Sequence, residues 1–113
     1  MSVPQPTCEV VVRPEVTILR PVGRFGLEAN AIIDRAVNKA IAGRPRRVVV
    51  DARGLEFIAS MALGQLVMLA RKVGAGGGSM QVQAAAPEIR DLLARTRLGE
   101  LLHLADALDP DCG

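Results

Sequence analysis

The sequence predicts an α/β domain built on a mixed β-sheet. Its 113 residues fall within the range of one domain, and half of them are apolar, which is enough to bury a core without a metal or disulfide staple. Short β-prone runs alternate with segments whose apolar residues recur at steps of three and four, in the order β-β-α-β-α-β-α. Strands separated by helices pair in parallel, whereas the first two strands form a hairpin, so the sheet should be mixed.

The first half of the chain predicts a hairpin followed by a helix. Residues 8–12 and 16–22 are β-prone, and Pro14 lies in the short turn between them. Residues 23–26 (Gly-Arg-Phe-Gly) interrupt the strand pattern. The helix is expected over residues 27–41, because its apolar residues share one face and a glycine and a proline follow it, as they do at many helix ends.

The second half continues the alternation of strands and helices. The valine run 48–50 predicts a strand covered on both faces, and Asp51 is expected to hold the connection after it through an Asx-type turn. The remaining predicted elements are a connection at 52–59, a helix at 60–73, a glycine-rich turn at 74–78, a strand at 80–84, helices at 87–96 and 98–102, an edge strand at 103–104 and a last helix at 105–108.

Residues 8–108 are predicted to form the folded domain, with a flexible leader at 1–7 and a flexible tail at 109–113. The leader is proline-rich and lacks the charged and apolar regions of a signal peptide. No apolar run approaches the roughly 18 residues that a membrane-spanning helix needs. We therefore expect a cytoplasmic protein that does not insert into membranes.

Charge and composition argue against nucleic acid as the partner. The chain carries 14 basic and 12 acidic side chains, which gives a net charge of +2, whereas nucleic-acid-binding domains concentrate basic residues on one face. It has two phenylalanines and no tyrosine or tryptophan, so it lacks the aromatic platforms on which bases stack. Arg44, Arg46 and Arg47 form a small basic cluster, which we interpret as a solvated turn.

The sequence predicts no catalytic, metal or cofactor site. Cys8 and Cys112 have no neighbouring Cys or His at metal-ligand spacing. In a reducing compartment we expect both to be free thiols, and a disulfide between them is the alternative. His103 has no Ser or Cys nucleophile at a recognisable spacing, and no paired acid and base is visible. We therefore expect the protein not to be an enzyme.

The order of elements and four of its segments resemble the STAS family of anti-sigma factor antagonists. Residues 48–64, VVVDARGLEFIASMALG, resemble the family's valine-rich strand ending in Asp, its short loop with glycine and an aromatic residue, and its small-residue helix start. Residues 23–26 resemble the family's Gly-x-Leu-Asp, residues 76–89 its next βα unit, and residues 96–102 its closing element. The resemblance implies a STAS-type fold, with a mixed four- to five-stranded sheet and three to four helices packed on it.

The resemblance also implies a function. Family members that antagonise anti-sigma factors bind an anti-sigma factor or histidine-kinase-like ATPase, and the partner kinase phosphorylates a serine that matches Ser60 here. The family is not generally catalytic. By this resemblance the partner-binding residues are Arg24, Phe25, Gly26, Ala59, Ser60, Met61, Ala62 and Gly64.

The sequence departs from the family pattern beside the candidate phospho-acceptor. Ala59 and Gly26 replace two family aspartates, and Met61 and Ala62 replace small residues of the motif. The site should therefore be more apolar and nearly uncharged. Ser60 is expected to be the N-cap of its helix, where a hydroxyl accepts a hydrogen bond from a first-turn amide and a phosphate is favoured.

Two functions are consistent with this pattern. The first is a signalling module that binds an anti-sigma factor or kinase-like regulator and is switched by phosphorylation of Ser60. The alternative is a constitutive structural or scaffold STAS subunit of a sensory or lipid-transport complex, without a phospho-switch. The sequence leaves self-association open.

Overall fold

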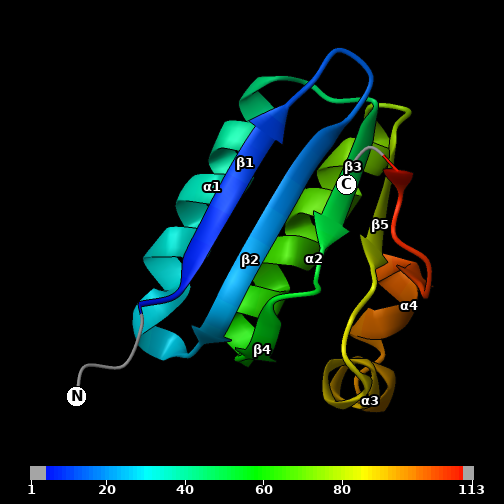
Figure 1. Cartoon of the computed structure of the whole chain (residues 1–113). Coiled ribbons are helices and arrows are strands. Elements are labelled where there is room, and N and C mark those ends of the chain that lie inside the picture. The colour runs from blue at the N-terminus through cyan, green and yellow to red at the C-terminus, as the bar shows by residue number, and fades with distance from the viewer. Residues whose placement is uncertain (1–4, 111–113) are drawn as a thin grey trace.

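The computed structural model describes residues 5–110, apart from the side chains of residues 98 and 99 (Figure 1). Its strands are β1 (Thr7–Val12), β2 (Thr17–Phe25), β3 (Arg47–Asp51), β4 (Leu55–Ile58), β5 (Ser79–Gln83) and β6 (Leu104–Ala105). Its helices are the 3-10 turn η1 (Leu27–Ala29), α1 (Asn30–Ala42), α2 (Ser60–Ala75), α3 (Pro87–Arg95) and α4 (Leu98–Leu102).

Across these residues the strands form one mixed sheet of six strands in the order β1-β2-β3-β5-β6, with β4 paired to β2. Strand β1 is antiparallel to β2, and the other pairs are parallel. The predicted mixed α/β fold is confirmed. The sheet has one strand more than expected, because residues 55–58 form β4 where the sequence predicted only a connection.

Helices α1 and α2 cover one face of the sheet (Figure 1). The main core lies between them and the side chains that point from the strands toward the helices, which are alternate residues as the two-residue period of a strand requires. In β3, Val48 and Val50 belong to this core, whereas Val49 faces the other way. The helices contribute their predicted apolar stripes, for example Ile33 and Val37 from α1.

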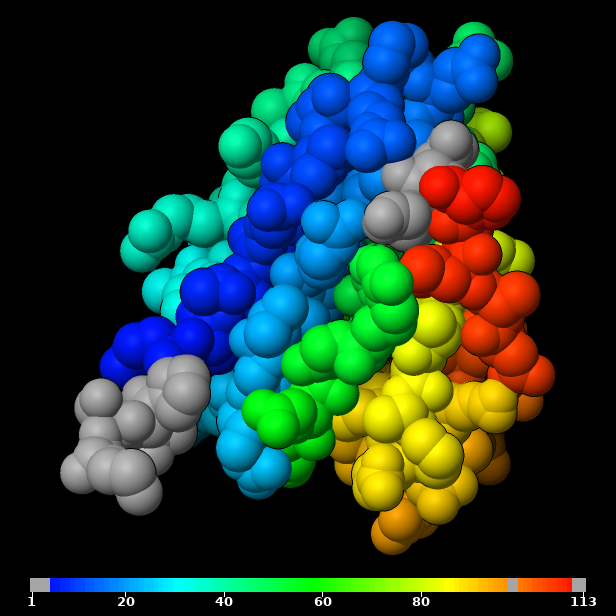
Figure 2. Space-filling model, viewed as in Figure 1, coloured from blue at the N-terminus to red at the C-terminus, as the bar shows by residue number. Residues whose placement is uncertain are grey.

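The opposite face of the sheet is covered only in part, by a chain segment instead of a helix. Figure 2 views this face, where β1 and β2 reach the surface and the C-terminal segment lies along the β5 side. Leu108 packs there against the buried cluster of Val16, Ile18 and Val49. The backbone N–H of Asp109 donates to Gln83 Oε1 at 2.7 Å, so ordered contacts extend one residue past the predicted domain end.

Three local predictions were wrong, each for a tertiary reason. Strand β2 continues through residues 23–25, because Gly23 adopts a positive φ of 102° and absorbs a register shift against β4. Strand β4 forms because Leu55 and Ile58 are buried against the core. No helix forms at 105–108 in the described part of the chain, where β6 is followed by a bend that carries Leu108 onto the sheet.

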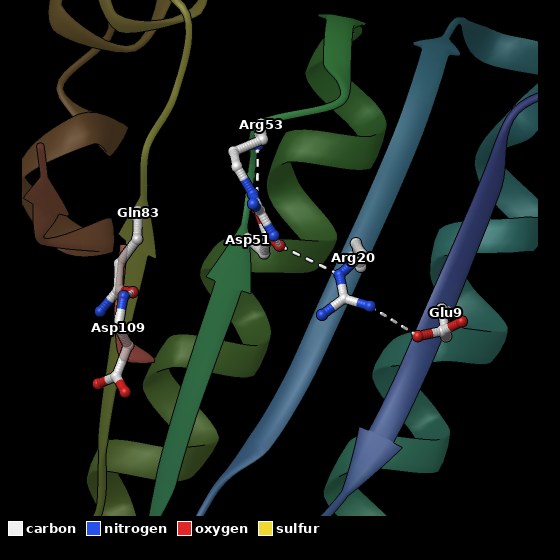
Figure 3. A network of polar contacts seen from close by, with 6 residues as sticks. All are labelled: Glu9, Arg20, Asp51, Arg53, Gln83 and Asp109. Carbon is white, nitrogen blue, oxygen red and sulfur yellow. Dashed lines mark hydrogen bonds and ion pairs between the residues drawn. The ribbon is translucent and has the colours of Figure 1, made fainter. Parts of the chain in front are cut away.

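A polar network lies on the same face of the sheet as Leu108 and centres on the buried carboxylate of Asp51, at the end of β3 (Figure 3). The backbone N–H of Arg53 donates to Asp51 Oδ1 at 3.2 Å, which confirms the predicted Asx-type turn. The Arg53 side chain donates to both carboxylate oxygens at 3.0 and 2.8 Å. Arg20 Nε donates to Oδ2 at 3.1 Å, and its Nη1 pairs with Glu9 at 2.9 Å.

This network controls the ionisation of Asp51. Burial by itself would raise the pKa of the Asp51 carboxyl, but hydrogen bonds from Arg53 and Arg20 outweigh burial and hold the pKa below its ordinary value of 3.8. A carboxyl whose pKa is lower in the folded than in the unfolded protein stabilises the fold at pH values above the unfolded pKa. This stabilisation is lost as the pH falls through the folded pKa.

We expect Asp51→Asn to lower the free energy of unfolding by about 2 kcal/mol at pH 7, because it removes the charge that compensates Arg20 and Arg53. The difference from wild type should shrink as the pH falls below about 4, where wild-type Asp51 takes up a proton. Urea unfolding at pH 7, 5 and 3 measures both effects. Asp91→Asn, at an exposed position, is the control. If the difference between Asp51→Asn and wild type does not depend on pH, the role of the Asp51 charge is contradicted.

Cys8 is the free cysteine of the described residues, and it is partly buried against the core. Burial raises the pKa of its thiol to about 11, although a hydrogen bond to the backbone of Arg20 acts in the opposite direction. Cys112 lies outside the described residues. In a Cys112→Ser variant at pH 8, we expect iodoacetamide to label Cys8 about a hundredfold more slowly than in the urea-unfolded protein. Equal rates would show that this thiol is accessible and easily ionised.

Candidate protein-docking site

The predicted site residues meet at one end of the sheet, where β2 and β4 end and α2 begins. Parallel pairing places Arg24 beside Phe57 and Phe25 beside Ile58. The backbone N–H of Ala59 then donates to the carbonyl of Phe25 at 2.8 Å. The end of β2 is thus joined to the start of α2, although the two segments lie more than 30 residues apart in the sequence.

Ala59, and not Ser60, is the N-cap of α2. Its backbone is extended, with φ −79° and ψ 161°, and the helical hydrogen bonds begin with Leu63 N–H donating to the Ala59 carbonyl at 3.0 Å. Ser60 is therefore the first helical residue, so the prediction that it caps the helix was wrong. Alanine offers no oxygen to the amides of the first turn, and no side chain of the described residues caps them.

Large apolar side chains are exposed around this helix start. Met61 in the first turn of α2 is 56% exposed, and Leu27 in the neighbouring η1 is 66% exposed. Ser60 and Gly64 are also exposed, one turn apart, and nothing lies within 4 Å of where a Cβ at Gly64 would be. Leu27 was not among the predicted site residues, because its position in the sequence indicates only a helical segment.

Two of the predicted partner-binding residues face the interior. Phe25 is fully buried, and Ala62 is only 1% exposed. Both belong to the main core. Their side chains cannot touch a partner on this surface, so they support the site from beneath.

The site carries two charged side chains: Arg24, which was among the predicted residues, and Glu28, which was not. The guanidinium carbon of Arg24 lies 5.0 Å from the ring centre of Phe57, a cation–π contact that holds this exposed arginine over the partly buried ring. A Cβ at Gly26 would lie only 2.9 Å from Glu28 Oε1. Glu28 therefore places a carboxylate beside Gly26, so the expectation of a nearly uncharged site was wrong.

The described residues place few reactive groups together. Within residues 5–110 no group of three His, Cys, Asp or Glu side chains is arranged to hold a metal ion. In the same part of the chain, none of the helices has the length and apolarity to cross a bilayer. What the site presents is an exposed apolar and polar surface at the start of a helix.

Comparisons with known proteins agree with this geometry. The family model described as STAS domain matches residues 7–110. A STAS-domain containing protein of Pseudomonas aeruginosa (strain UCBPP-PA14) is 31% identical over 83 residues, which cover 74% of this chain and 81% of that protein.

Solved structures show the same fold. The crystal structure of an anti-sigma factor antagonist from Mycobacterium paratuberculosis is 25% identical with a TM-score of 0.83, covering 96% of this chain and 93% of that one. The anti-sigma factor antagonist SpoIIAA in its unphosphorylated form is 19% identical with a TM-score of 0.78, covering 94% and 92%. The predicted family is confirmed: this chain belongs to the STAS domain family.

Proposed function

We propose that this chain is a non-catalytic, cytoplasmic interaction module of bacterial signalling that binds an anti-sigma factor or a related histidine-kinase-like ATPase. The docking surface consists of the exposed residues Arg24, Leu27, Ser60, Met61 and Gly64 around the start of α2. Its likeness to an anti-sigma factor antagonist over nearly the whole of both chains supports this choice of partner.

The observation that carries the proposal is the exposure of Leu27 and Met61 on two elements that contact each other, η1 and α2. Exposed apolar side chains that gather beside polar ones mark interaction surfaces. Methionine is flexible and polarizable, so Met61 suits contacts that adapt to a partner. Gly64 keeps the next turn of the helix free of a side chain, so a partner can approach the helix closely.

Ser60 is the phospho-acceptor of this surface. It is exposed, and it lies in a helical turn whose amides have no side-chain cap. A phosphate there gains the favourable field of the helix N-terminus and adds nearly two negative charges beside Met61. Those charges would have to be desolvated against an apolar contact, so phosphorylation releases the partner. The solved SpoIIAA structure is described as that protein's unphosphorylated form, which is consistent with a phosphorylation switch on this fold.

A constitutive scaffold subunit is the second candidate. Ala59 is the specific observation that favours it, because this N-cap lacks the oxygen with which an Asp would hold the helix start and its acceptor serine. A scaffold keeps its partners regardless of the charge on Ser60. The two functions therefore differ in their response to a negative charge at that position.

We expect Met61→Asp to remove the regulatory ATPase that wild type captures from its native cells, because it puts a charge in the apolar contact. Val12→Asp is the matched control. Val12 is 58% exposed, against 56% for Met61, and it lies at the opposite end of the sheet, where β1 ends. Quantitative mass spectrometry of the captured proteins should show at least a tenfold loss for Met61→Asp alone. Equal capture by both variants would place the docking surface elsewhere.

Ser60→Asp separates the two candidate functions in the same experiment. A negative charge in the first turn favours the helix, so this variant should be at least as stable as wild type, and a lost partner cannot be ascribed to unfolding. Loss of the ATPase supports the phospho-switch. Unchanged capture with Ser60→Asp, together with loss in Met61→Asp, supports the scaffold.

We expect Ala59→Ser to raise the free energy of unfolding by about 1 kcal/mol, because a hydroxyl at this extended N-cap satisfies a first-turn amide of α2. Ala70→Ser, in the interior of the same helix, is the control and should be neutral or destabilising. Urea unfolding measures both. If Ala59→Ser brings no gain, the amides of the first turn are not available to an anion.

A further inference from the structure

A basic hollow lies at the opposite end of the molecule from the docking surface. Its lining residues come from the loop after α1 and from the end of α2. These segments lie at the end of the sheet where β3 and β5 begin (Figure 1). Its volume is about 300 Å³, at the lower end of the range for small-molecule sites. It is lined by Ile41, Arg44, Pro45, Arg46, Lys72, Val73 and Gly76.

Three of these lining residues are cations, and none is an acid. Arg44, Arg46 and Lys72 make no ion pair with any residue in the described part of the chain. The helices α1 and α2 both end here, and each C-terminus carries about half a negative charge. Two such ends offset about one of the three positive charges. The remaining positive charge is about enough to balance a phosphate dianion.

The wall of the hollow is apolar. Ile41, Pro45 and Val73 line it beside the cations, and Val73 is part of the main core. A bare inorganic anion would leave this wall in contact with water. The combination matches a ligand that carries both a phosphate and an apolar group.

The hollow is held in shape by backbone contacts. The N–H groups of Ser79 and Gly78 donate to the carbonyls of Arg46 and Val73, each at 2.9 Å. A Cβ at Gly78 would lie 2.5 Å from the Arg46 carbonyl oxygen, so only glycine allows the two loops to meet. Arg44 has a φ of 46°, which is uncommon for a residue other than glycine. Its backbone N–H donates a hydrogen bond to the Ile41 carbonyl.

We propose that this hollow binds an organic phosphate. Arg44, Arg46 and Lys72 hold the phosphate, and the apolar group lies against Ile41 and Val73. The chemistry is the same whether the phosphate belongs to a small soluble molecule or to the headgroup of a lipid. This site does not depend on the docking function, because it shares no residue with the docking surface.

The test uses the full chain, with hexyl phosphate and inorganic phosphate as soluble probes in calorimetry. The lipid probe is phosphatidylcholine vesicles with and without phosphatidic acid, in a flotation assay. Lys72→Gln removes a cation of the hollow, and Arg71→Gln removes the same charge from the exposed neighbouring position, which does not line it. Shifts of the backbone amide signals of residues 43, 44, 46 and 76 in NMR spectra locate the binding.

We expect hexyl phosphate to bind at least tenfold more tightly than inorganic phosphate, because each buried methylene contributes about fourfold. Lys72→Gln should weaken binding about tenfold, and Arg71→Gln should leave it unchanged. The same pattern with phosphatidic acid vesicles alone supports the proposal and identifies a lipid as the source. The proposal is overturned if the protein binds neither hexyl phosphate nor phosphatidic acid vesicles, or if both substitutions weaken binding equally. Neither result bears on capture of the ATPase through Met61.

Discussion

The arrangement of this domain depends on one long strand, β2, that pairs with two shorter parallel strands in succession. Residues 17–19 pair with β3, and residues 23–25 pair with β4. The chain must therefore leave β3 and return, three residues later, to the same neighbour. Asp51 makes this step possible, because it holds the connecting loop through Arg53 and ties the loop to β2 through Arg20. The start of α2, directly after β4, is thereby fixed relative to the end of β2.

The parts of this fold that the sequence predicted well are those specified by local pattern. The periodicity of α1 and α2 and the valine run of β3 each identify an element without reference to the rest of the chain. Strand β4 has only four residues, and its identity depends on pairing with a segment some 30 residues earlier. The residues 23–26 look like a break because glycine usually ends strands, but Gly23 is used here for a bulge inside one. Leu108 was assigned to a helix, although its burial is on the sheet.

The same limit applies to the site. The family pattern indicated which segments meet, namely 24–26 and 59–64, and the backbone bond between Ala59 and Phe25 brings them together. It did not indicate which side chains face outward, so Phe25 and Ala62 were included and Leu27 was left out. The carboxylate of Glu28 lies beside Gly26, and this proximity cannot be read from either position alone. The basic hollow likewise needs Lys72, which comes from a segment 26 residues after Arg46.

Helix α2 carries both of these surfaces, Ser60 at its first residue and Lys72 in its last turn. At 1.5 Å per residue the two positions are about 18 Å apart along the axis, whereas charges in physiological salt are screened over about 8 Å. A charge placed on Ser60 is therefore not felt electrostatically at Lys72, and the two ends of the rod can be occupied independently. Communication between them would require α2 to move as a rigid body against the sheet, and the hydrogen bond that ties the start of α2 to Phe25 opposes such a movement.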